Sequence, residues 1–149
     1  MQISNLTLRL AAVTLVLGLF FTGQALADPG HDLGAATDGE RRAKGLKVMP
    51  LTEGKLDGEI PSVEGHSVRL RRFEVAPGGV IPLHNHDGRP AIAVVIEGEI
   101  VEYRSDETEP HTLGPGDVSP EFDGLHHWWK NESDQTVVIL GFDVYKRPF

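Results

Sequence analysis

The sequence predicts a single all-β domain, either a sandwich or a barrel. From Ser67 onward, apolar and polar residues alternate with a period of two, which is typical of strands with one buried face. Turn-forming Gly and Pro residues recur about every ten residues, a spacing typical of sandwiches and barrels. No stretch after residue 45 has helical periodicity. The chain has 149 residues, which suits one domain and leaves little room for a second.

Residues 1–27 have the pattern of a secretory signal peptide. Arg9 is their one charged residue, the apolar run 11–21 follows it, and Ala25-Leu26-Ala27 supplies a small-residue cleavage site. The run is about half the length that spans a bilayer comfortably, so an uncleaved anchor is the weaker alternative. We therefore expect an exported protein with no stable membrane association after cleavage. No Arg pair precedes the run, which favours the general secretory route.

The amino-acid composition excludes several kinds of site and partner. The chain contains no cysteine, which excludes disulfides, thiolate nucleophiles and thiolate metal ligands. A bacterial periplasm is the expected compartment, and full secretion remains open. The formal net charge of −8 argues against nucleic acid or an anionic membrane surface as a partner.

The expected elements follow in chain order. Residues 28–60 are predicted to form a polar N-terminal arm, a short strand at 46–51 and a loop, and 61–149 the β-domain. A turn is expected at Pro77-Gly78-Gly79, a hairpin turn at Glu97-Gly98 and another turn at 114–117. The strands of the β-domain are expected over residues 67–75, 80–86, 91–96, 99–104, 126–130 and 136–145.

Three of the seven histidines form a candidate metal site. His84 and His86 are two residues apart on an expected strand, so both rings point to one face. His127 lies 41 residues after His86 on another expected strand, and the adjacent His126 would point the opposite way. Imidazole suits Zn, Cu, Fe and Ni and also occurs at Mn sites. The remaining histidines, His31, His66 and His111, are expected in solvated loops.

Two segments around these histidines resemble the paired motifs of the cupin superfamily. The first reads Gly78-(5)-His84-Asn85-His86-(4)-Ala91-(6)-Gly98. The second reads Gly116-(5)-Phe122-Asp123-Gly124-(2)-His127-(3)-Asn131. The resemblance covers residues 66–145. Phe122 stands where the second motif has Pro, and Ala91 stands where the first motif has a metal-binding Glu.

The resemblance implies a single-domain jelly-roll β-barrel with a short N-terminal arm and a homodimeric assembly. It implies that His84, His86 and His127 bind one divalent transition metal ion, which could be Fe, Zn, Cu, Mn or Ni. Alanine cannot bind a metal, so no carboxylate is expected from position 91. Four acidic residues near the motifs are not predicted as ligands: Asp87, Glu97, Glu121 and Asp123.

Three neutral imidazoles would leave coordination positions open for substrate and O2. Similar three-His cupin sites occur in thiol dioxygenases and in ring- and diketone-cleaving dioxygenases. The resemblance therefore implies a metal-dependent, dioxygenase-like enzyme acting on a small organic molecule. Two alternatives remain open, namely a non-catalytic periplasmic cupin that binds a metal or small ligand, and a metal-dependent isomerase or lyase acting on a sugar or acid. A cupin that has lost its metal is a further alternative.

Two more residues are candidates for substrate contact. Alternation places Trp129 on the same side as His127 and Trp128 on the opposite side, so Trp129 could stack on a planar substrate. Arg89 could bind a substrate carboxylate with its forked guanidinium. The alternatives are core or dimer packing for Trp129 and a solvated loop position for Arg89.

Overall fold

The structure is a computed structural model that describes residues 33–146. The predicted signal peptide and His31 lie outside the described residues. Within them the chain forms one short 3-10 turn and eight strands. The elements are η1 (Gly34–Ala36), β1 (Lys44–Lys55), β2 (His66–Asn85), β3 (Ala91–Glu97), β4 (Ile100–Arg104), β5 (His111–Leu113), β6 (Val118–Glu121), β7 (His126–Lys130) and β8 (Val137–Lys146). None of the helices in 33–146 has the length and apolar character needed to cross a bilayer.

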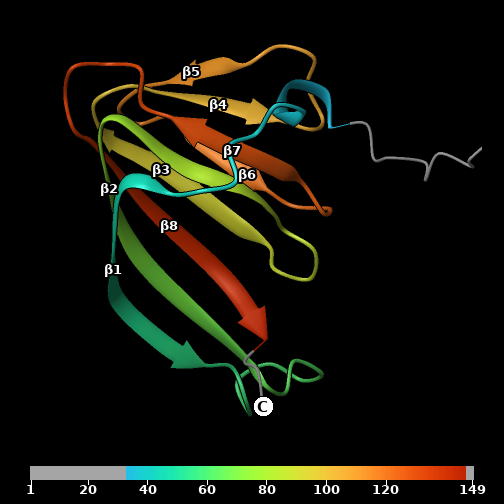
Figure 1. Ribbon diagram of the computed structural model, residues 1–149. Coiled ribbons are helices and arrows are strands. Elements are labelled where there is room, and N and C mark those ends of the chain that lie inside the picture. Colours follow the sequence, from blue (N-terminus) through green and yellow to red (C-terminus); the bar gives the residue numbers. More distant parts are fainter. Residues whose placement is uncertain (1–32, 147–149) are drawn as a thin grey trace, which may run out of the picture.

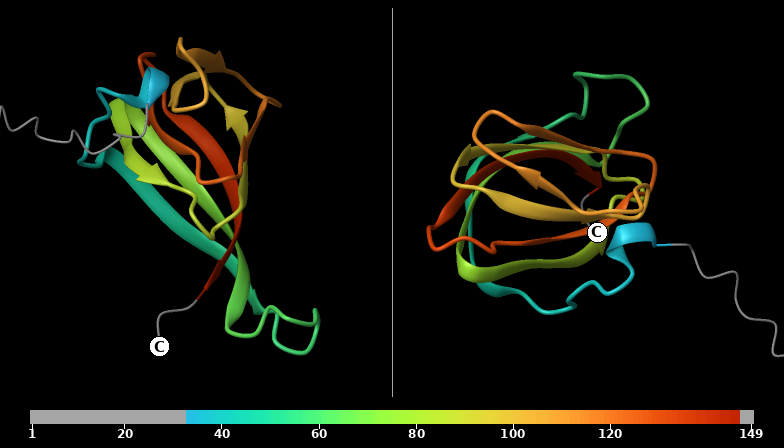
Figure 2. Two further views of the ribbon diagram at one scale, coloured as in Figure 1. Left: turned by 90° about the vertical axis from the view of Figure 1, so that its right-hand side faces the viewer. Right: turned by 90° about the horizontal axis from the view of Figure 1, so that it is seen from above.

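The strands curl into a jelly-roll barrel, as predicted (Figure 1). Their order in the sheet is β5-β4-β7-β2-β8-β3-β6, and β1 pairs with β2. All pairs are antiparallel. The view from above shows the strands arranged around a common axis (Figure 2). Most neighbours in the sheet are distant in the sequence, which brings the two motif segments together.

The hairpin predicted at Glu97-Gly98 is wrong. Gly98 does turn the chain, with a φ of 76°. However, β3 pairs with β6 and β8, whereas β4 pairs with β5 and β7. A local turn signal identifies a change of direction, but it does not say which strand will be the partner. This connection carries the chain across the barrel.

The turn predicted at Pro77-Gly78-Gly79 is also wrong, because β2 runs through it. Gly78 has a φ of 67°, which bends the strand without reversing it. The pairing partner changes at the bend. Val75 pairs with Val137 of β8, and Val80 pairs with Lys130 of β7. The bend therefore lets β2 pair with β8 along its first part and with β7 along its last part.

Strand β1 is longer than expected, and two strands were not expected. β1 pairs with β2 from Lys55↔Ser67 to Lys44↔Val80. The segment before it lies against β2, where the Leu83 N–H donates to the carbonyl of Glu40 at 2.7 Å. The unexpected strands β5 and β6 have three and four residues. Strand β6 ends on Glu121, so this omission concerns the functional site directly.

The inner face of the barrel changes in character along its axis. At one end, buried apolar side chains pack together, including Val75, Val95, Ile100 and Ile139. Further along, the inward positions of β2, β8, β3 and β6 lie in register as Arg69, Asp143, Ala91 and Glu121. Alternation makes this row face the interior, as the buried core positions on the same strands do. The barrel therefore has an apolar end and a charged end.

Candidate metal centre

The structure brings His84, His86 and His127 together, as predicted. His84 lies near the end of β2 and pairs in register with His127 of β7, and His86 follows β2 directly. The three Nε2 atoms are mutually 3.1 Å apart. His86 and His127 are 2% and 0% exposed. These three residues form a group that could hold one metal ion.

The other nitrogen of each ring has its own hydrogen-bond acceptor. His84 Nδ1 donates to the carbonyl of Pro82 at 2.8 Å, and His86 Nδ1 donates to that of Arg89 at 3.0 Å. His127 Nδ1 lies 2.6 Å from Glu102 Oε1. An acceptor at each Nδ1 assigns the proton there and leaves a lone pair on each Nε2. Three lone pairs that face one another repel unless a cation or a proton donor lies between them.

Burial keeps the three rings neutral. It lowers the pKa of His84 to about 3 and that of His86 to about 4, with nearby His127 and Arg89 acting in the same direction. The pKa of His127 is also lowered by burial, although Glu102 opposes the shift. Metal binding requires deprotonated imidazole. The cluster therefore has its donor atoms ready at neutral pH.

The spacing of the donors fits a metal ion. Two nitrogens bound to one ion at about 2.0–2.1 Å, with a bond angle between about 90° and 110°, lie roughly 2.9–3.4 Å apart. The observed 3.1 Å lies within this range. The neutral rings, the fixed tautomers and the spacing all suit the nitrogen-binding transition metals.

Glu102 contacts His127 on the side of the ring that faces away from the three Nε2 atoms. It was not among the residues predicted from the sequence. Its side chain is fully buried, accepts from Ser119 Oγ at 2.8 Å and pairs with Arg104 at 3.3 Å. Burial acts to raise the pKa of Glu102, but hydrogen bonds from His127 and Ser119 outweigh it and leave the pKa lowered. His111, expected in solvent, instead lies 3.1 Å from the second carboxylate oxygen. A carboxylate behind a metal-binding histidine orients the ring and strengthens it as a donor.

Glu121 brings a carboxyl group to the edge of the cluster. Its Oε2 lies 3.2 Å from His86 Nε2, and its Oε1 lies 3.9 Å from His127 Nε2. Burial, followed by the charge of Glu102, raises the pKa of Glu121 to about 8. A bound divalent cation would act in the opposite direction and favour the ionised form. The sequence did not predict this contact, because β6 was not recognised as a strand.

Trp129 and Arg89 both line the cavity beside the histidines. Trp129 is 2% exposed, and its Nε1 lies 3.1 Å from His127 Nδ1, whose proton goes to the closer Glu102. Arg89 donates to Asp143 at 3.1 Å and to the carbonyl of Asn85 at 2.9 Å. Trp129 lies on the same side as His127, as alternation predicted, and contact of Trp129 and Arg89 with substrate remains a prediction. Trp128 lies on the opposite face, where it stacks on Tyr103 with ring centroids 4.0 Å apart.

The cavity has a volume of about 390 Å³, within the range of small-molecule sites of roughly 300–1,000 Å³. Its apolar walls include Phe73, Ile81, Trp129 and Ile139. Ala91 and Ala93 keep the space beside the histidines open. Its charged wall is formed by Arg89 together with three residues that were not predicted from the sequence, namely Arg69, Arg71 and Asp143. The sequence does contain one indication of this wall, because Arg69, Arg71 and Phe73 alternate along β2 and so share one face of the strand. The alternation does not show whether that face points into the barrel or to solvent.

Comparison with known proteins identifies the family. A family model described as a cupin domain matches residues 71–145. The auxin-binding protein ABP19a of Prunus persica is 34% identical over 93 residues, which cover 60% of this chain and 44% of that protein. The germin-like protein subfamily 1 member 3 of Arabidopsis thaliana is 30% identical over 135 residues, which cover 83% of this chain and 58% of that protein. The chain thus spans only about half the length of these relatives.

Solved structures show the same fold. Rru_A2000 from Rhodospirillum rubrum, a cupin-2 domain, aligns with a TM-score of 0.56 and 18% identity over 72% of this chain and 64% of that chain. An oxalate oxidase in complex with the substrate analogue glycolate aligns with a TM-score of 0.52 and 22% identity. That alignment covers 68% of this chain and 55% of the other.

Proposed function

This chain belongs to the cupin family, and we propose that it is a metal-dependent enzyme acting on a small organic molecule. His84, His86 and His127 would hold one divalent transition metal ion. One observation carries this proposal. Three neutral imidazoles, of which His86 and His127 are buried and His84 is partly buried, direct the lone pairs of their Nε2 atoms at one point, with separations of 3.1 Å. Buried polar atoms without partners are costly, and a shared cation satisfies all three.

We propose that Glu121 supplies the carboxylate that Ala91 cannot. The two residues are direct cross-strand partners on β3 and β6. Directly opposed residues have Cβ atoms about 4.5–5.5 Å apart, so either position can direct a carboxylate toward the same site. The Glu121 oxygens at 3.2 and 3.9 Å from two of the Nε2 atoms support this role.

A dioxygenase-like oxidation is the proposed reaction class. When bound, the metal would act as a Lewis acid that can accept substrate and O2 at positions the protein leaves open. The residues of the chain would then bind and orient the substrate. Ala91 and Ala93 leave room beside the histidines, and the indole of Trp129 offers a flat apolar wall. Phe73, Ile81 and Ile139 would exclude water from the bound substrate.

The experiment begins with elemental analysis of protein purified from its native compartment. We expect one equivalent of a divalent transition metal in the wild type and none in His84→Ala/His86→Ala. Oxygen consumption is then measured with candidate substrates at matched metal content. Turnover that needs O2 supports the proposed class, whereas metal-dependent turnover without O2 would indicate an isomerase or lyase. Thermal stabilisation by a ligand without turnover would indicate a binding protein. A full equivalent of metal in the double variant would contradict the site.

We further propose that the chain is exported, because residues 1–27 have the charged start, apolar run and cleavage site of a signal peptide. Mass spectrometry of the protein from its native source should find a mature N-terminus at Asp28. We propose the bacterial periplasm as the compartment of this cysteine-free protein. Cell fractionation tests this location. Retention of Met1 in the mature protein would contradict cleavage.

We also propose a homodimer, as the resemblance implies. Ile92 and Val118 are 40% and 52% exposed and lie on the outer face of β3 and β6. Large exposed apolar side chains that cluster on one face favour association. Sedimentation should give twice the monomer mass, and Ile92→Lys/Val118→Lys should give the monomer. A wild-type monomer at micromolar concentration would contradict the proposal.

A further inference from the structure

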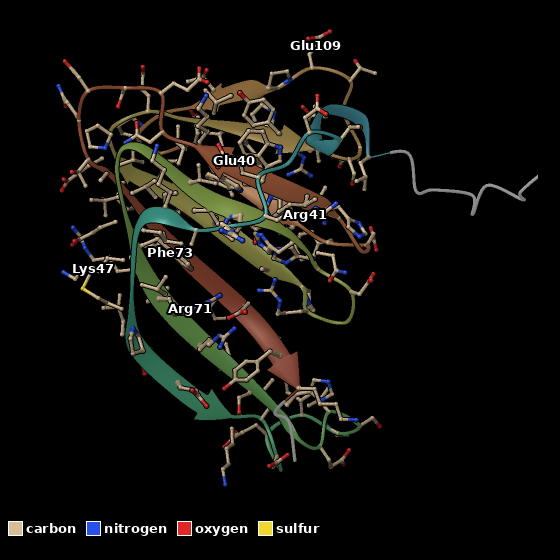
Figure 3. The ribbon with its side chains drawn as sticks, in the orientation of Figure 1. Glu40, Arg41, Lys47, Arg71, Phe73 and Glu109 are labelled. Atoms are coloured by element: carbon tan, nitrogen blue, oxygen red, sulfur yellow. The ribbon has the colours of Figure 1, made fainter. Side chains whose placement is uncertain are left out.

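The charged wall of the cavity contains a guanidinium that the protein does not satisfy. Arg71 lies on the inner face of β2, next to Phe73 on the same face (Figure 3). Its Nη2 donates to Asp143 at 3.2 Å. Its Nε is buried and has no hydrogen-bond partner among the described residues. A buried N–H without an acceptor is costly, and this one lies in a cavity wall.

The two other arginines of this wall are more fully engaged. Arg69 forms a forked pair with Asp143 at 2.7 and 2.8 Å, and its guanidinium stacks over the Tyr145 ring at 4.1 Å. Arg89 donates to Asp143 and to the Asn85 carbonyl. Arg69 is therefore held as a structural pair. Arg71 is the arginine with most donors left for a ligand.

Arg71 lines the cavity, and the Phe73 ring covers one side of its guanidinium, 4.9 Å from the guanidinium carbon to the ring centroid. The Phe73 ring also fills the place of a side chain at Gly141, the cross-strand neighbour of Arg71 on β8. On the other side of Gly141, β3 contributes Ala93, which pairs with Gly141 and whose side chain is only a methyl group. Arg71 and Ala93 both line the cavity. A ligand group can approach Arg71 from the cavity.

The charges of the wall do not balance. Three arginines share one carboxylate, Asp143, which is 1% exposed. The remaining acid of the cavity is Glu121, which is needed at the histidine cluster. The wall therefore has a formal excess of two positive charges, although the whole chain has a net charge of −8. A partly buried cationic excess favours an anionic occupant.

We propose that this wall binds the carboxylate of the substrate, with Arg71 as the main contact and Arg89 as a second. The inference rests on the proposed function, because it names the substrate class of the same cavity. The substrate is then a small organic acid with an apolar body. Its carboxylate lies at Arg71, its body lies against Ile81, Trp129 and Ile139, and its reacting part faces the histidines. Arg89 connects the two regions, because its backbone carbonyl accepts from His86 while its side chain contacts Asp143.

The test compares a carboxylate with a neutral analogue of the same shape. Phenylacetate and phenylacetamide are titrated into the zinc-loaded and the metal-free protein, with calorimetry and Trp fluorescence as readouts. Charged hydrogen bonds are worth about 1.5–3 kcal/mol, so we expect phenylacetate to bind at least about tenfold more tightly. This preference should persist in the metal-free protein, because it arises from Arg71. Metal content is measured separately, so loss of the metal site and loss of acid binding are distinguishable.

Arg71→Met removes the guanidinium and keeps an apolar chain of similar length. It should remove most of the tenfold preference for the acid, because only Arg89 would then contact the carboxylate. Arg72→Met is the matched control, because Arg72 is the next residue on β2 and pairs with Glu74 instead of the cavity residues. Arg72→Met should leave both affinities unchanged. Equal affinity for the acid and the amide in the wild type would overturn the proposal. So would a preference that Arg71→Met leaves undiminished or that requires the metal.

A folding control keeps the test decisive. Arg71→Lys retains the charge but not the fork, so it should keep part of the preference for phenylacetate. Asp143 keeps Arg69 and Arg89 as partners in either variant. We therefore expect circular dichroism and melting temperature close to wild type. If Arg71→Met does not fold, Arg71→Lys and the acid–amide comparison in the wild type decide the matter, and equal affinities there contradict the proposal.

Discussion

Ala91 of β3 and Glu121 of β6 face each other directly across an antiparallel ladder. Ala91 stands where the first cupin motif has its carboxylate, and Glu121 directs a carboxyl group to within 3.2 Å of His86 Nε2. A carboxyl group therefore lies beside the histidines, although it comes from β6 and not from β3. The cavity gains the space of a small side chain at position 91.

Exchanging the two side chains tests this relationship. Glu121→Ala should weaken zinc binding by about 10–100-fold, an effect of the size seen when a supporting carboxylate at a metal site is lost. Ala91→Glu/Glu121→Ala should restore most of the affinity, because the carboxylate returns to the partner position. The readout is competitive zinc titration. No loss in the single variant, or no recovery in the double variant, would contradict the proposed role of Glu121.

Glu102 should act through His127 and not through the metal. Glu102→Ala removes the acceptor at His127 Nδ1 and leaves Ser119 and Arg104 without their buried partner. We expect zinc affinity to fall by about 10–100-fold. Glu107→Ala is the control, because Glu107 is exposed and contacts His111 at 2.8 Å without reaching His127. Equal effects of the two substitutions would show that Glu102 has no special function.

The stability of the metal-free protein should depend on the two low-pKa histidines. The folded pKa values are about 3 for His84 and about 4 for His86, against about 6.5 in the unfolded chain. Below pH 6.5 the unfolded chain therefore binds protons that the folded chain does not. Each histidine should lower the free energy of unfolding by up to about 1.4 kcal/mol per pH unit from pH 6.5 down to about pH 4. Glu121, with its raised pKa, has the opposite sign between about pH 4.5 and 8.

Comparing the wild type with His84→Ala/His86→Ala separates these contributions, because Glu121 is present in both. Urea unfolding in a chelating buffer at a series of pH values measures the difference. The double variant should become more stable relative to the wild type as the pH falls from 6.5. A difference that does not change with pH would mean that the rings are solvated in the folded state.

Filling the cavity should separate substrate binding from metal binding. Ala93→Leu places three more carbons beside the histidines, at a residue that is 5% exposed and lines the cavity. We expect unchanged zinc content and a loss of phenylacetate binding of at least about tenfold, because the extra volume occupies the ligand's space. Val94→Leu, on the other face of the same strand, is the control. Retained phenylacetate affinity in Ala93→Leu would place the ligand elsewhere.

Much of the fold and the histidine cluster could be predicted from the sequence. The sequence predicted the bounds of β3, β4, β7 and β8 to within one or two residues, because runs of strand-forming residues there are bounded by turn-forming residues. His84, His86 and His127 could be grouped because of their motif spacing. Trp129 could be assigned to the cavity side by alternation from His127, because β7 is regular.

The missed features depend on pairing between distant strands. Strand β6 has only four residues and contains Pro120, which the position of β6 at the end of the sheet order tolerates. Without that strand, nothing placed Glu121 opposite Ala91. Arg69 and Arg71 had the pattern of a polar surface, because a pattern shows that residues share a face but not which way the face points. Pairing of β2 with β8 turns that face inward and brings Asp143 to it.

The most direct test of the central claim is nitrogen-15 NMR of the histidine side chains during zinc titration. Without metal, His84, His86 and His127 should each be neutral and protonated at Nδ1. One equivalent of zinc should then shift the three Nε2 resonances together and leave those of His66 and His126 unchanged. A proton on any of these Nε2 atoms, or zinc-dependent shifts at fewer than all three rings, would contradict a metal centre built from these residues.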